Sequence, residues 1–302
     1  ILRKFKRKNI EVISNPEFLR EGEALRDFRF PDRIVIGANN NKIFKTMQNL
    51  YQPLINKGAK FFSTSRRGAE LIKYASNAFL ATKITFINEL ANLCEVSNIN
   101  IEEISLGMGS DVRIGSRFLR AGPAYGGSCF PKDTKGLVST GDKFNVDLSV
   151  VKSVIRSNYN RINLHIKRIE KILGNNLKNK KIVFLGVTFK PNTDDMRDST
   201  SLKMIPYVLK KGAKIEYYDP TGKKNEFKKL KNCKFNSSVK NMCKNADLLI
   251  LHTEWDEFKS LDFKKLVKKR NFKLFDLRNL YNFNEMLNKK IKYYSVGRPS
   301  IN

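Results

Sequence analysis

Histidine, cysteine and tryptophan are all scarce in this chain of 302 residues, which has two histidines, four cysteines and one tryptophan. The cysteines are widely separated and none has the close spacing of metal ligands; they are Cys94, Cys129, Cys233 and Cys243. With so few histidines beside them, we expect no metal site. Scattered thiols are typical of proteins in a reducing compartment, so the sequence favours the cytoplasm.

Long apolar runs are also missing. No stretch approaches the roughly 20 apolar residues that cross a bilayer, so we expect neither a membrane-spanning helix nor a membrane partner. The first eight residues are rich in lysine and arginine and have neither the apolar core nor the cleavage site of a signal peptide. The chain starts with Ile1 rather than methionine, and we therefore expect it to be a fragment whose N-terminus lies upstream.

Acidic residues are outnumbered by 58 basic residues to 29, which gives a formal net charge of +29. Such a charge raises the hypothesis of a nucleic-acid-binding protein. Most of the basic residues are lysines spread along the whole chain, and the densest runs, 223–234 and 264–270, are typical of solvated helix faces and loops. We therefore expect no nucleic-acid partner, because attraction for a small anionic substrate is a simpler use of the same field.

The glycine fingerprint Gly-x-Gly-x-x-Gly between a strand and a helix is absent, and with it the usual phosphate cradle of a dinucleotide-binding domain. The first 63 residues otherwise resemble the last part of an α/β unit. Strands are predicted at 10–14, 33–37 and 59–62, with a loop at 15–23 leading into a short helix and a helix at about 42–56.

A region of helical periodicity comes next. From residue 65 to about 96, small and apolar residues from Ala69 to Leu93 recur at helical spacing with no proline. They occupy more than one stripe, which suits a helix buried between domains or between subunits. Further helices are predicted at 101–108, 132–143 and 148–173.

The periodicity changes after residue 180. Buried strands are predicted at 181–186, 214–218, 246–252 and 272–276, with helices between them, one of which covers 199–211. Strands that alternate with helices imply a parallel sheet whose two faces are covered. The sequence therefore predicts a second α/β domain over about 180–302.

The segment most suggestive of chemistry runs from Gly126 to Asp133 and reads GGSCFPKD. Its two glycines let a ligand approach the backbone closely, so we expect Cys129 to be presented rather than packed. Asp133 is near enough in sequence to orient or deprotonate a water. A nucleophile beside an acid/base group is what a covalent acyl intermediate and its hydrolysis require. A loop cysteine without chemistry is the alternative that this segment alone leaves open.

Four motifs match one known family in their order and spacing: NPEFLREG at 15–22, KYASN at 73–77, GGSCFPKD at 126–133 and FKPNTDDMR at 189–197. Together they resemble the UDP-glucose/GDP-mannose dehydrogenase family, and within it the enzymes that act on UDP-glucose. The resemblance runs from about residue 10 to the end of the chain.

The resemblance implies an α/β fold in three parts. A C-terminal Rossmann-like domain with a parallel sheet is joined through a central helical dimerisation domain to the remainder of an N-terminal Rossmann domain. The implied boundaries are 1–63 for the C-terminal part of the NAD-binding domain, 64–178 for the central domain with the cysteine loop, and 179–302 for the UDP-sugar-binding domain. A homodimer or higher homo-oligomer is also implied.

The family oxidises the C6 alcohol of a nucleotide sugar to a carboxylate and reduces two NAD⁺, so the resemblance implies conversion of UDP-glucose into UDP-glucuronate. A thiolate at Cys129 would trap the aldehyde as a thiohemiacetal, and oxidation to a thioester would precede cleavage by water. Lys73 and Asn77, one helical turn apart, would stabilise the oxyanion. Asp133 would activate the water, and Glu17 would be the acid/base group near C6.

The resemblance also implies which residues bind the ligands. Those for the nucleotide sugar are Phe18, Leu19, Phe118, Arg120, Tyr125, Gly126, Phe189, Lys190 and Arg278. Lys190 and Arg278 suit a diphosphate because both are cations. Arg113 matches a family arginine that reaches the active site of the neighbouring subunit. For the cofactor NAD, Glu21 would contact the nicotinamide side and Arg197 would contribute a contact from the C-terminal domain.

Some family features are not in this chain: the glycine fingerprint, the acidic residue for the adenosine ribose and the threonine that helps to hold the catalytic water. We therefore expect the chain alone to be inactive and assign the activity to the full-length protein. The alternatives are a GDP-mannose or other nucleotide-sugar 6-dehydrogenase, and a non-catalytic fragment that binds nucleotide sugars or oligomerises. Ser128 argues against the UDP-N-acetylhexosamine dehydrogenases, which tend to have histidine before the cysteine.

Overall fold

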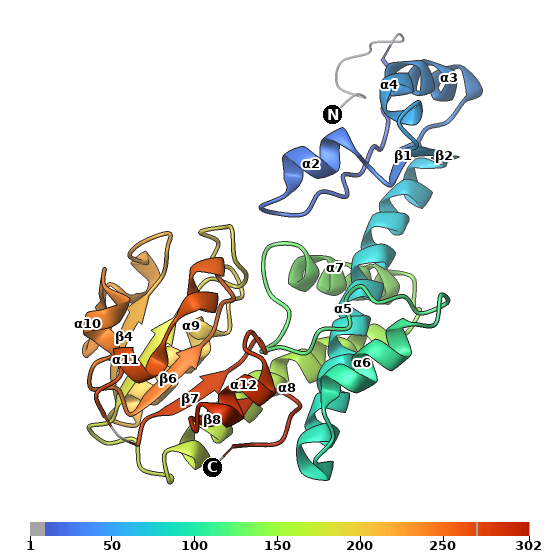
Figure 1. The fold of residues 1–302 in the computed structure, drawn as a ribbon. Coiled ribbons are helices and arrows are strands. Elements are labelled where there is room, and N and C mark those ends of the chain that lie inside the picture. The colour runs from blue at the N-terminus through green and yellow to red at the C-terminus, as the bar shows by residue number, and fades with distance from the viewer. Residues whose placement is uncertain (1–9, 270, 302) are drawn as a thin grey trace. The chain divides into compact units, whose positions relative to one another are not determined.

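The computed structural model describes residues 10–269 and 271–301. The chain divides into two compact units, Ile1–Asn77 and Ala78–Asn302, here named the N-terminal and the C-terminal unit (Figure 1). The long helix α5, Arg66–Ser97, belongs to both units because the boundary falls within it. Among the described residues, no helix combines the length and the apolar character that are needed to cross a bilayer.

The N-terminal unit contains a pair of parallel strands. Its elements are α2 (Ala24–Arg29), β1 (Arg33–Gly37), α3 (Asn41–Leu50), α4 (Gln52–Ile55), β2 (Lys60–Thr64) and the start of α5. Strands β1 and β2 pair in parallel over their full length. Ile34, Ile36 and Ala59 form a small core on which apolar residues of α3 and α4 pack, so this arrangement buries little surface.

Two sequence predictions for the N-terminal unit are wrong in detail. Residues 10–14 do not form a strand: only Ser14 pairs, in an isolated antiparallel bridge with Gly37, and Ile10 and Val12 are exposed. The helix predicted at 42–56 is interrupted at Tyr51, because Pro53 starts the short helix α4 and has no N–H to continue α3. The short helix after the loop at 15–23 is confirmed as α2.

The first part of the C-terminal unit is helical, as predicted. It consists of the rest of α5, α6 (Ile101–Gly109), α7 (Phe130–Lys143) and α8 (Ser149–Ile172). Helix α7 begins two residues earlier than predicted, and Cys129 is its N-cap residue. Pro131 falls in the first turn, where its missing N–H removes no helical hydrogen bond.

A six-stranded parallel sheet forms the second part of the C-terminal unit and confirms the predicted fold class. Its strands are β3 (Lys181–Leu185), β4 (Lys214–Tyr218), β5 (Cys233–Phe235), β6 (Leu248–Leu251), β7 (Lys273–Asp276) and β8 (Lys292–Ser295). Its short helices are α9 (Ser201–Lys210), η1 (Asn225–Phe227), α10 (Val239–Cys243), η2 (Asp256–Ser260), α11 (Phe263–Leu266) and α12 (Phe283–Asn288). The strand order is β5-β4-β3-β6-β7-β8, with β5 and β8 at the edges. Both edge strands escaped prediction because each has only three or four residues.

Successive residues of the central strands enter two different cores. Ile182 and Phe184 of β3 pack in a cluster with residues of α8 and α9, whereas Val183 and Leu185 pack with residues of α10, η2 and α11. This alternation is what a sheet with two covered faces requires. It explains why these central strands are continuous apolar runs in the sequence.

The segment after β8 ties the sheet to the helices of the same unit. The Gly297 N–H donates to Glu95 of α5 at 2.7 Å, and the Gly297 carbonyl accepts the Ile101 N–H at 2.8 Å. A Cβ on Gly297 would lie 2.7 Å from carbons of Ala91 and Ile101. Only glycine fits so close to two helices at a φ of +68°.

Candidate active site

Cys129 is the N-cap residue of α7 and so lies at the positive end of the helix dipole. Its side chain is half-buried, and its Sγ lies 3.5 Å from the Ser128 hydroxyl. One turn into the helix, the Asp133 N–H donates to the Cys129 carbonyl at 2.8 Å. The carboxylate of Asp133 is buried, and the Lys132 ammonium lies 3.7 Å from it.

The glycine pair before Cys129 packs against the loop that follows β3. A Cβ on Gly126 would lie 2.5 Å from the Asp198 carbonyl oxygen. Gly127 has a φ of +78°, and its N–H donates to the Arg197 carbonyl at 2.9 Å. The two glycines therefore permit close contact between two segments of backbone. The sequence predicted only that they leave space for a ligand.

A cavity of about 220 Å³ lies next to this turn, and seven of the residues implied for nucleotide-sugar binding line it. They are Phe118, Arg120, Tyr125, Gly126, Phe189, Lys190 and Arg278. The cavity lies beyond the carboxyl ends of β3, β6 and β7, from which Phe189, Glu254 and Arg278 follow. The sheet order reverses between β3 and β6, and this is the position at which open α/β sheets bind nucleotides.

Arg278 is a cation of this cavity with several partners. Its Nε donates to the His252 carbonyl at 2.8 Å and lies 3.0 Å from the Glu254 carboxylate, and its Nη2 donates to the Phe189 carbonyl. Burial lowers the pKa of Arg278, and the negative charge of Glu254 opposes that shift. The guanidinium is therefore held in place from the two loops that meet at the centre of the sheet.

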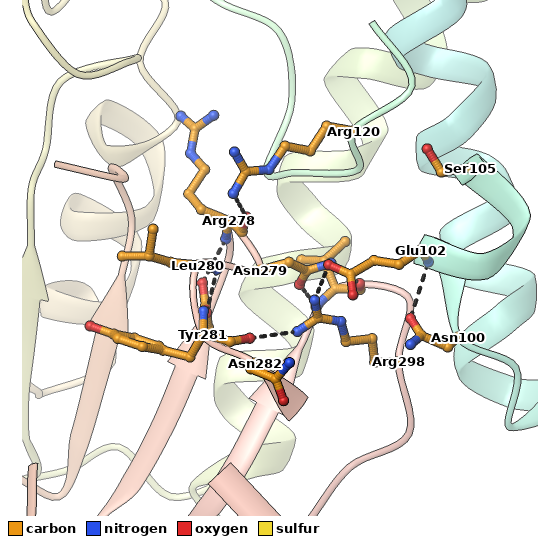
Figure 2. A network of polar contacts seen from close by, with 12 residues as sticks. Asn100, Glu102, Ser105, Arg120, Arg278, Asn279, Leu280, Tyr281, Asn282 and Arg298 are labelled. Atoms are coloured by element: carbon orange, nitrogen blue, oxygen red, sulfur yellow. Dashed lines mark hydrogen bonds and ion pairs between the residues drawn. The ribbon is translucent and has the colours of Figure 1, made fainter. Parts of the chain in front are cut away.

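Figure 2 shows how the loop after β7 is anchored to the helical part of the unit. Arg120 donates to the Arg278 carbonyl at 2.9 Å. Below it, Arg298 donates to the Tyr281 carbonyl at 3.0 Å and forms an ion pair with Glu102 of α6. These contacts fix the backbone that carries Arg278.

Aromatic rings also line the cavity. Phe118 and Tyr125 both meet Phe130 edge to face, with ring centroids 6.3 Å and 6.1 Å away. Phe118 has a φ of +65°, which is a strained conformation for a bulky residue. Strain of this kind is concentrated at binding and active sites, and here it lies in the wall of the cavity.

The N-terminal unit holds the residues of the two earlier motifs. The Lys73 ammonium donates to the Glu17 carbonyl at 2.6 Å and lies 3.1 Å from the Glu17 carboxylate, whose other oxygen accepts the Leu19 N–H at 2.7 Å. Phe18 lies beneath two cations, with the Arg33 guanidinium 4.0 Å from its ring centroid. The NPEF motif is thereby bound to the helix of the KYASN motif.

Lys73 and Asn77 lie one turn apart on α5, as their spacing predicts. Asn77 is buried, and 17% of the Lys73 side chain is exposed. Both side chains can donate hydrogen bonds, which is the property required of residues that stabilise an oxyanion.

The remaining nominated residues are not among those that line the cavity. Arg113 is 86% exposed and paired with Asp111 at 2.6 Å, and Arg197 is 66% exposed and paired with Asp195 at 2.9 Å. Glu21 lies in the turn before α2 and is half-buried. The geometry of the C-terminal unit therefore gives no additional evidence that Arg113 or Arg197 contacts a ligand bound in the same subunit.

Seven residues that line the cavity were not nominated from the sequence: Ile84, Asn88, Ala121, Gly122, Ala124, Phe130 and Glu254. Helical spacing could have revealed two of them. From Asn77, Ile84 is seven residues away and Asn88 eleven, so they fall on one stripe of α5. Glu254 follows the carboxyl end of β6, the edge where ligands bind, and its position was the available signal.

The described residues do not contain a complete dinucleotide site. The N-terminal unit has two parallel strands, and the chain has no glycine-rich turn between a strand and a helix that could hold a pyrophosphate. Within the same described ranges, no group of three or more His, Cys, Asp or Glu side chains is placed to hold a metal ion.

A Rossmann-like parallel sheet with a cationic cavity at its reversal point, and a cysteine turn beside that cavity, is typical of enzymes that act on nucleotide-linked substrates. Comparison with known families identifies which. Three domain models of the UDP-glucose/GDP-mannose dehydrogenase family match the chain: the NAD binding domain at residues 2–55, the central domain at 67–160 and the UDP binding domain at 183–283.

Curated relatives agree with these matches. The chain is 44% identical to the UDP-glucose 6-dehydrogenase of Rickettsia felis over 292 residues, which are 96% of this chain and 65% of that protein. It is also 44% identical to the UDP-glucose 6-dehydrogenase of Rhizobium meliloti, of which it covers 67%. The chain belongs to the UDP-glucose/GDP-mannose dehydrogenase family. It spans about two thirds of the length of these relatives.

Solved structures give the same result. A UDP-glucose dehydrogenase from the hyperthermophilic archaeon Pyrobaculum islandicum superimposes with a TM-score of 0.84 at 33% identity, covering 95% of this chain and 63% of that one. An NDP-N-acetyl-D-galactosaminuronic acid dehydrogenase from Methanosarcina mazei gives a TM-score of 0.79 at 25% identity. The fold is therefore shared by family members with different sugar substrates.

Proposed function

We propose that the protein, when it carries a complete NAD-binding domain, oxidises UDP-glucose to UDP-glucuronate. The observation that carries this proposal is the set of seven implied sugar-nucleotide residues around one cavity beside the Cys129 turn. The names of the relatives that are 44% identical support UDP-glucose as the substrate. The overall reaction consumes UDP-glucose, two NAD⁺ and water and yields UDP-glucuronate, two NADH and three protons.

In this proposal the cavity binds the UDP part of the substrate. Lys190, Arg278 and Arg120 supply positive charge for a diphosphate, and Arg278 is already oriented by Glu254. Phe118, Tyr125 and Phe189 supply apolar and aromatic surface for the uracil and the sugar. Phe18 and Leu19 of the N-terminal unit would contribute to the sugar end of the substrate.

The covalent chemistry is assigned to Cys129. NAD⁺, when bound, accepts a hydride in each of the two oxidations. The Cys129 thiolate adds to the C6 aldehyde to form a thiohemiacetal, and removal of a second hydride from that carbon leaves a thioester. Water then attacks the thioester carbonyl and releases the carboxylate and the thiol, a step that we assign to activation by Asp133. A thiol nucleophile requires a reducing compartment, so we propose the cytoplasm as the location.

Lys73 and Asn77 are assigned to charge stabilisation. Negative charge develops on the C6 oxygen when the thiolate adds and again when water attacks, and two donors one helical turn apart can point at the same oxygen. Glu17, which bonds to Lys73, is assigned to proton transfer at C6. Glu21 and Arg197 are the proposed contacts of this chain to NAD.

A homodimer is part of the proposal. Large apolar side chains are exposed on the C-terminal unit at Phe79, Phe86, Leu93 and Val96 of α5, Leu106 of α6, and Val112. Phe79, Phe86 and Leu93 repeat every seven residues, which is one face of the helix. Exposed apolar residues in such a row are typical of a subunit interface. Arg113 follows this row, in agreement with a role in the neighbouring subunit's site.

The experiment that tests the proposal compares substrates. Isothermal titration of the chain with UDP-glucose, GDP-mannose and UDP-N-acetylglucosamine should give the tightest binding for UDP-glucose. The full-length protein should then reduce NAD⁺ fastest with the same sugar. Preference for GDP-mannose would assign the protein to the other branch of the family, and binding of UDP-glucose without turnover would support a non-catalytic role.

A further inference from the structure

One wall of the cavity of about 220 Å³ is formed by part of the segment that connects α6 to α7. Residues 121–126 are irregular, and five of these six residues line the cavity: Ala121, Gly122, Ala124, Tyr125 and Gly126. A buried backbone must place its N–H and carbonyl groups on hydrogen-bond partners. An irregular loop has no ladder to provide them, so its conformation depends on partners from other elements.

Side chains of the two long helices provide these partners. Asn88 of α5 accepts the Gly122 N–H at 2.9 Å. Asn158 of α8 accepts the Tyr125 N–H at 2.9 Å and donates to the Tyr125 carbonyl at 3.0 Å. The paired bonds of Asn158 imitate a strand partner, and they fix both the position and the tilt of the peptide that carries Tyr125.

Arg161, one turn after Asn158 on α8, completes the support. Its Nε donates to the Gly122 carbonyl at 2.7 Å, and its Nη1 donates to the Asn88 carbonyl at 2.7 Å and to Asn92 at 2.9 Å. The side chain is 5% exposed, and burial lowers the pKa of Arg161 to about 9. At neutral pH it is therefore a buried cation whose three hydrogen-bond acceptors carry no formal charge.

Packing alone does not hold this arrangement. A second cavity, of about 130 Å³, lies between α5 and α8 and is lined by Asn88, Asn158 and Arg161 among others. Apolar residues that filled this space would join the two helices without the penalty of burying a charge. The bond from the Arg161 Nε to the loop is directional, and apolar packing cannot supply a directional bond.

We propose that Arg161 is a positioning residue of the nucleotide-sugar site. Together with Asn158 and Asn88 it sets the conformation of residues 122–125, so that Tyr125 and Gly126 are pre-arranged for the ligand before it binds. This inference rests on the proposed function, because it takes the cavity to be the site of the UDP group.

A matched pair of variants tests the proposal in the chain itself. Arg168 lies two turns further along the same helix and is also largely buried, but it bonds to Glu95 and to the Ser295 carbonyl instead of the loop. Arg161→Lys and Arg168→Lys therefore remove comparable buried guanidinium groups. The guanidinium of Arg161 is the one that supports residues 122–125. UDP binding is measured by isothermal titration calorimetry and stability by thermal unfolding.

Arg161→Lys should raise the Kd for UDP by about tenfold or more, because the lysine ammonium is a compact charge and lacks the planar fork that reaches Gly122, Asn88 and Asn92 together. Arg168→Lys should lower the melting temperature about as much as Arg161→Lys does. It should leave the Kd for UDP within about twofold of the wild-type value. Calorimetry separates the two effects, since partial unfolding lowers the apparent number of sites rather than the affinity of each site. Equal Kd values for the two variants would overturn the proposal.

Asn158→Asp provides a second test that does not depend on the folding of Arg161→Lys. The substitution keeps the acceptor for the Tyr125 N–H and replaces the donor to the Tyr125 carbonyl by a second carboxylate oxygen. It should also raise the Kd for UDP by about tenfold. An unchanged Kd in this variant contradicts the proposal. Failure of the wild-type chain to bind UDP would instead refute the proposed function itself.

Discussion

The ring of Phe189 occupies the space where a side chain on Gly127 would begin. A Cβ built on Gly127 would lie 2.6 Å from Cζ and 2.7 Å from Cε2 of that ring. Phe189 lines the cavity, and Gly127 lies two residues before Cys129. The two residues therefore set the distance between the proposed nucleophile and the proposed nucleotide site.

Gly127→Ala should reduce the activity of the full-length protein strongly. The new methyl group must displace the Phe189 ring, and alanine is strained at a φ of +78° by about 1–3 kcal/mol. Displacement of the Cys129 turn by about 1 Å is expected to lower kcat/KM by about a hundredfold. Steady-state kinetics with UDP-glucose measure the effect.

Gly107→Ala is the matched control. Gly107 lies within α6, and a Cβ there would meet nothing within 4 Å. Alanine should leave kcat/KM unchanged and raise the free energy of unfolding by up to about 1 kcal/mol. Equal activity in the two variants would show that contact between the glycine turn and Phe189 has no functional importance.

Cys129→Ser should abolish the steady release of UDP-glucuronate. A hydroxyl at this position is a far weaker nucleophile than a thiolate, so kcat should fall by more than about a thousandfold. The Kd for UDP should stay close to that of the wild type, because the cavity does not include Cys129. Turnover at the wild-type rate would refute the covalent mechanism.

Lys73→Ala should act on catalysis more than on binding. Removal of one donor to a developing oxyanion lowers kcat by about a hundredfold or more. Lys42→Ala, at an exposed position of α3, is the control and should have no effect. If Lys73→Ala raised KM and left kcat unchanged, Lys73 would be a ground-state binding residue.

Stability should fall as the pH is lowered from 7 to 5.5. Burial, together with the nearby cations Arg161 and Arg168, holds the pKa of His165 well below its ordinary value, and burial with Arg278 does the same for His252. Below about pH 6.5 the unfolded chain binds protons that the folded chain does not. Each histidine should then remove about 1.4 kcal/mol of stability per pH unit.

Urea unfolding at a series of pH values measures this dependence. The sequence contains two histidines, so the variant His165→Gln/His252→Gln removes both proton-binding groups. Its stability is expected to change less between pH 7 and pH 5.5 than that of the wild type. An identical slope in the two proteins would mean that other groups cause the pH dependence.

The fold could be predicted from the sequence where its pattern was long and regular. The uninterrupted helical spacing of α5 and the apolar strands β3 and β6 left little choice of structure. Residues 10–14 were misassigned because a short apolar run resembles a strand in sequence, whereas in the structure the segment meets β1 at Ser14 alone, in one bridge with Gly37. Pairing is a property of the whole sheet, and short sequence windows do not contain it.

The candidate site could be predicted only as far as motifs name it. Cys129 was indicated by its own segment and Arg278 by the resemblance, and their location beside one cavity depends on how a helix start and a strand end meet in space. Asn158 and Arg161 carry no motif. Their importance arises from bonds to a loop more than thirty residues away in sequence, which no local pattern reveals.

In the proposed mechanism the Cys129 thiol holds the half-oxidised sugar after the first oxidation, through the second oxidation and until water releases the carboxylate. The most direct measurement is the amount of NADH that the full-length protein forms per UDP-glucose consumed, with the free aldehyde assayed in parallel. The account predicts two NADH for each sugar and no free aldehyde. One NADH per sugar, with UDP-glucose aldehyde accumulating in solution, would contradict it.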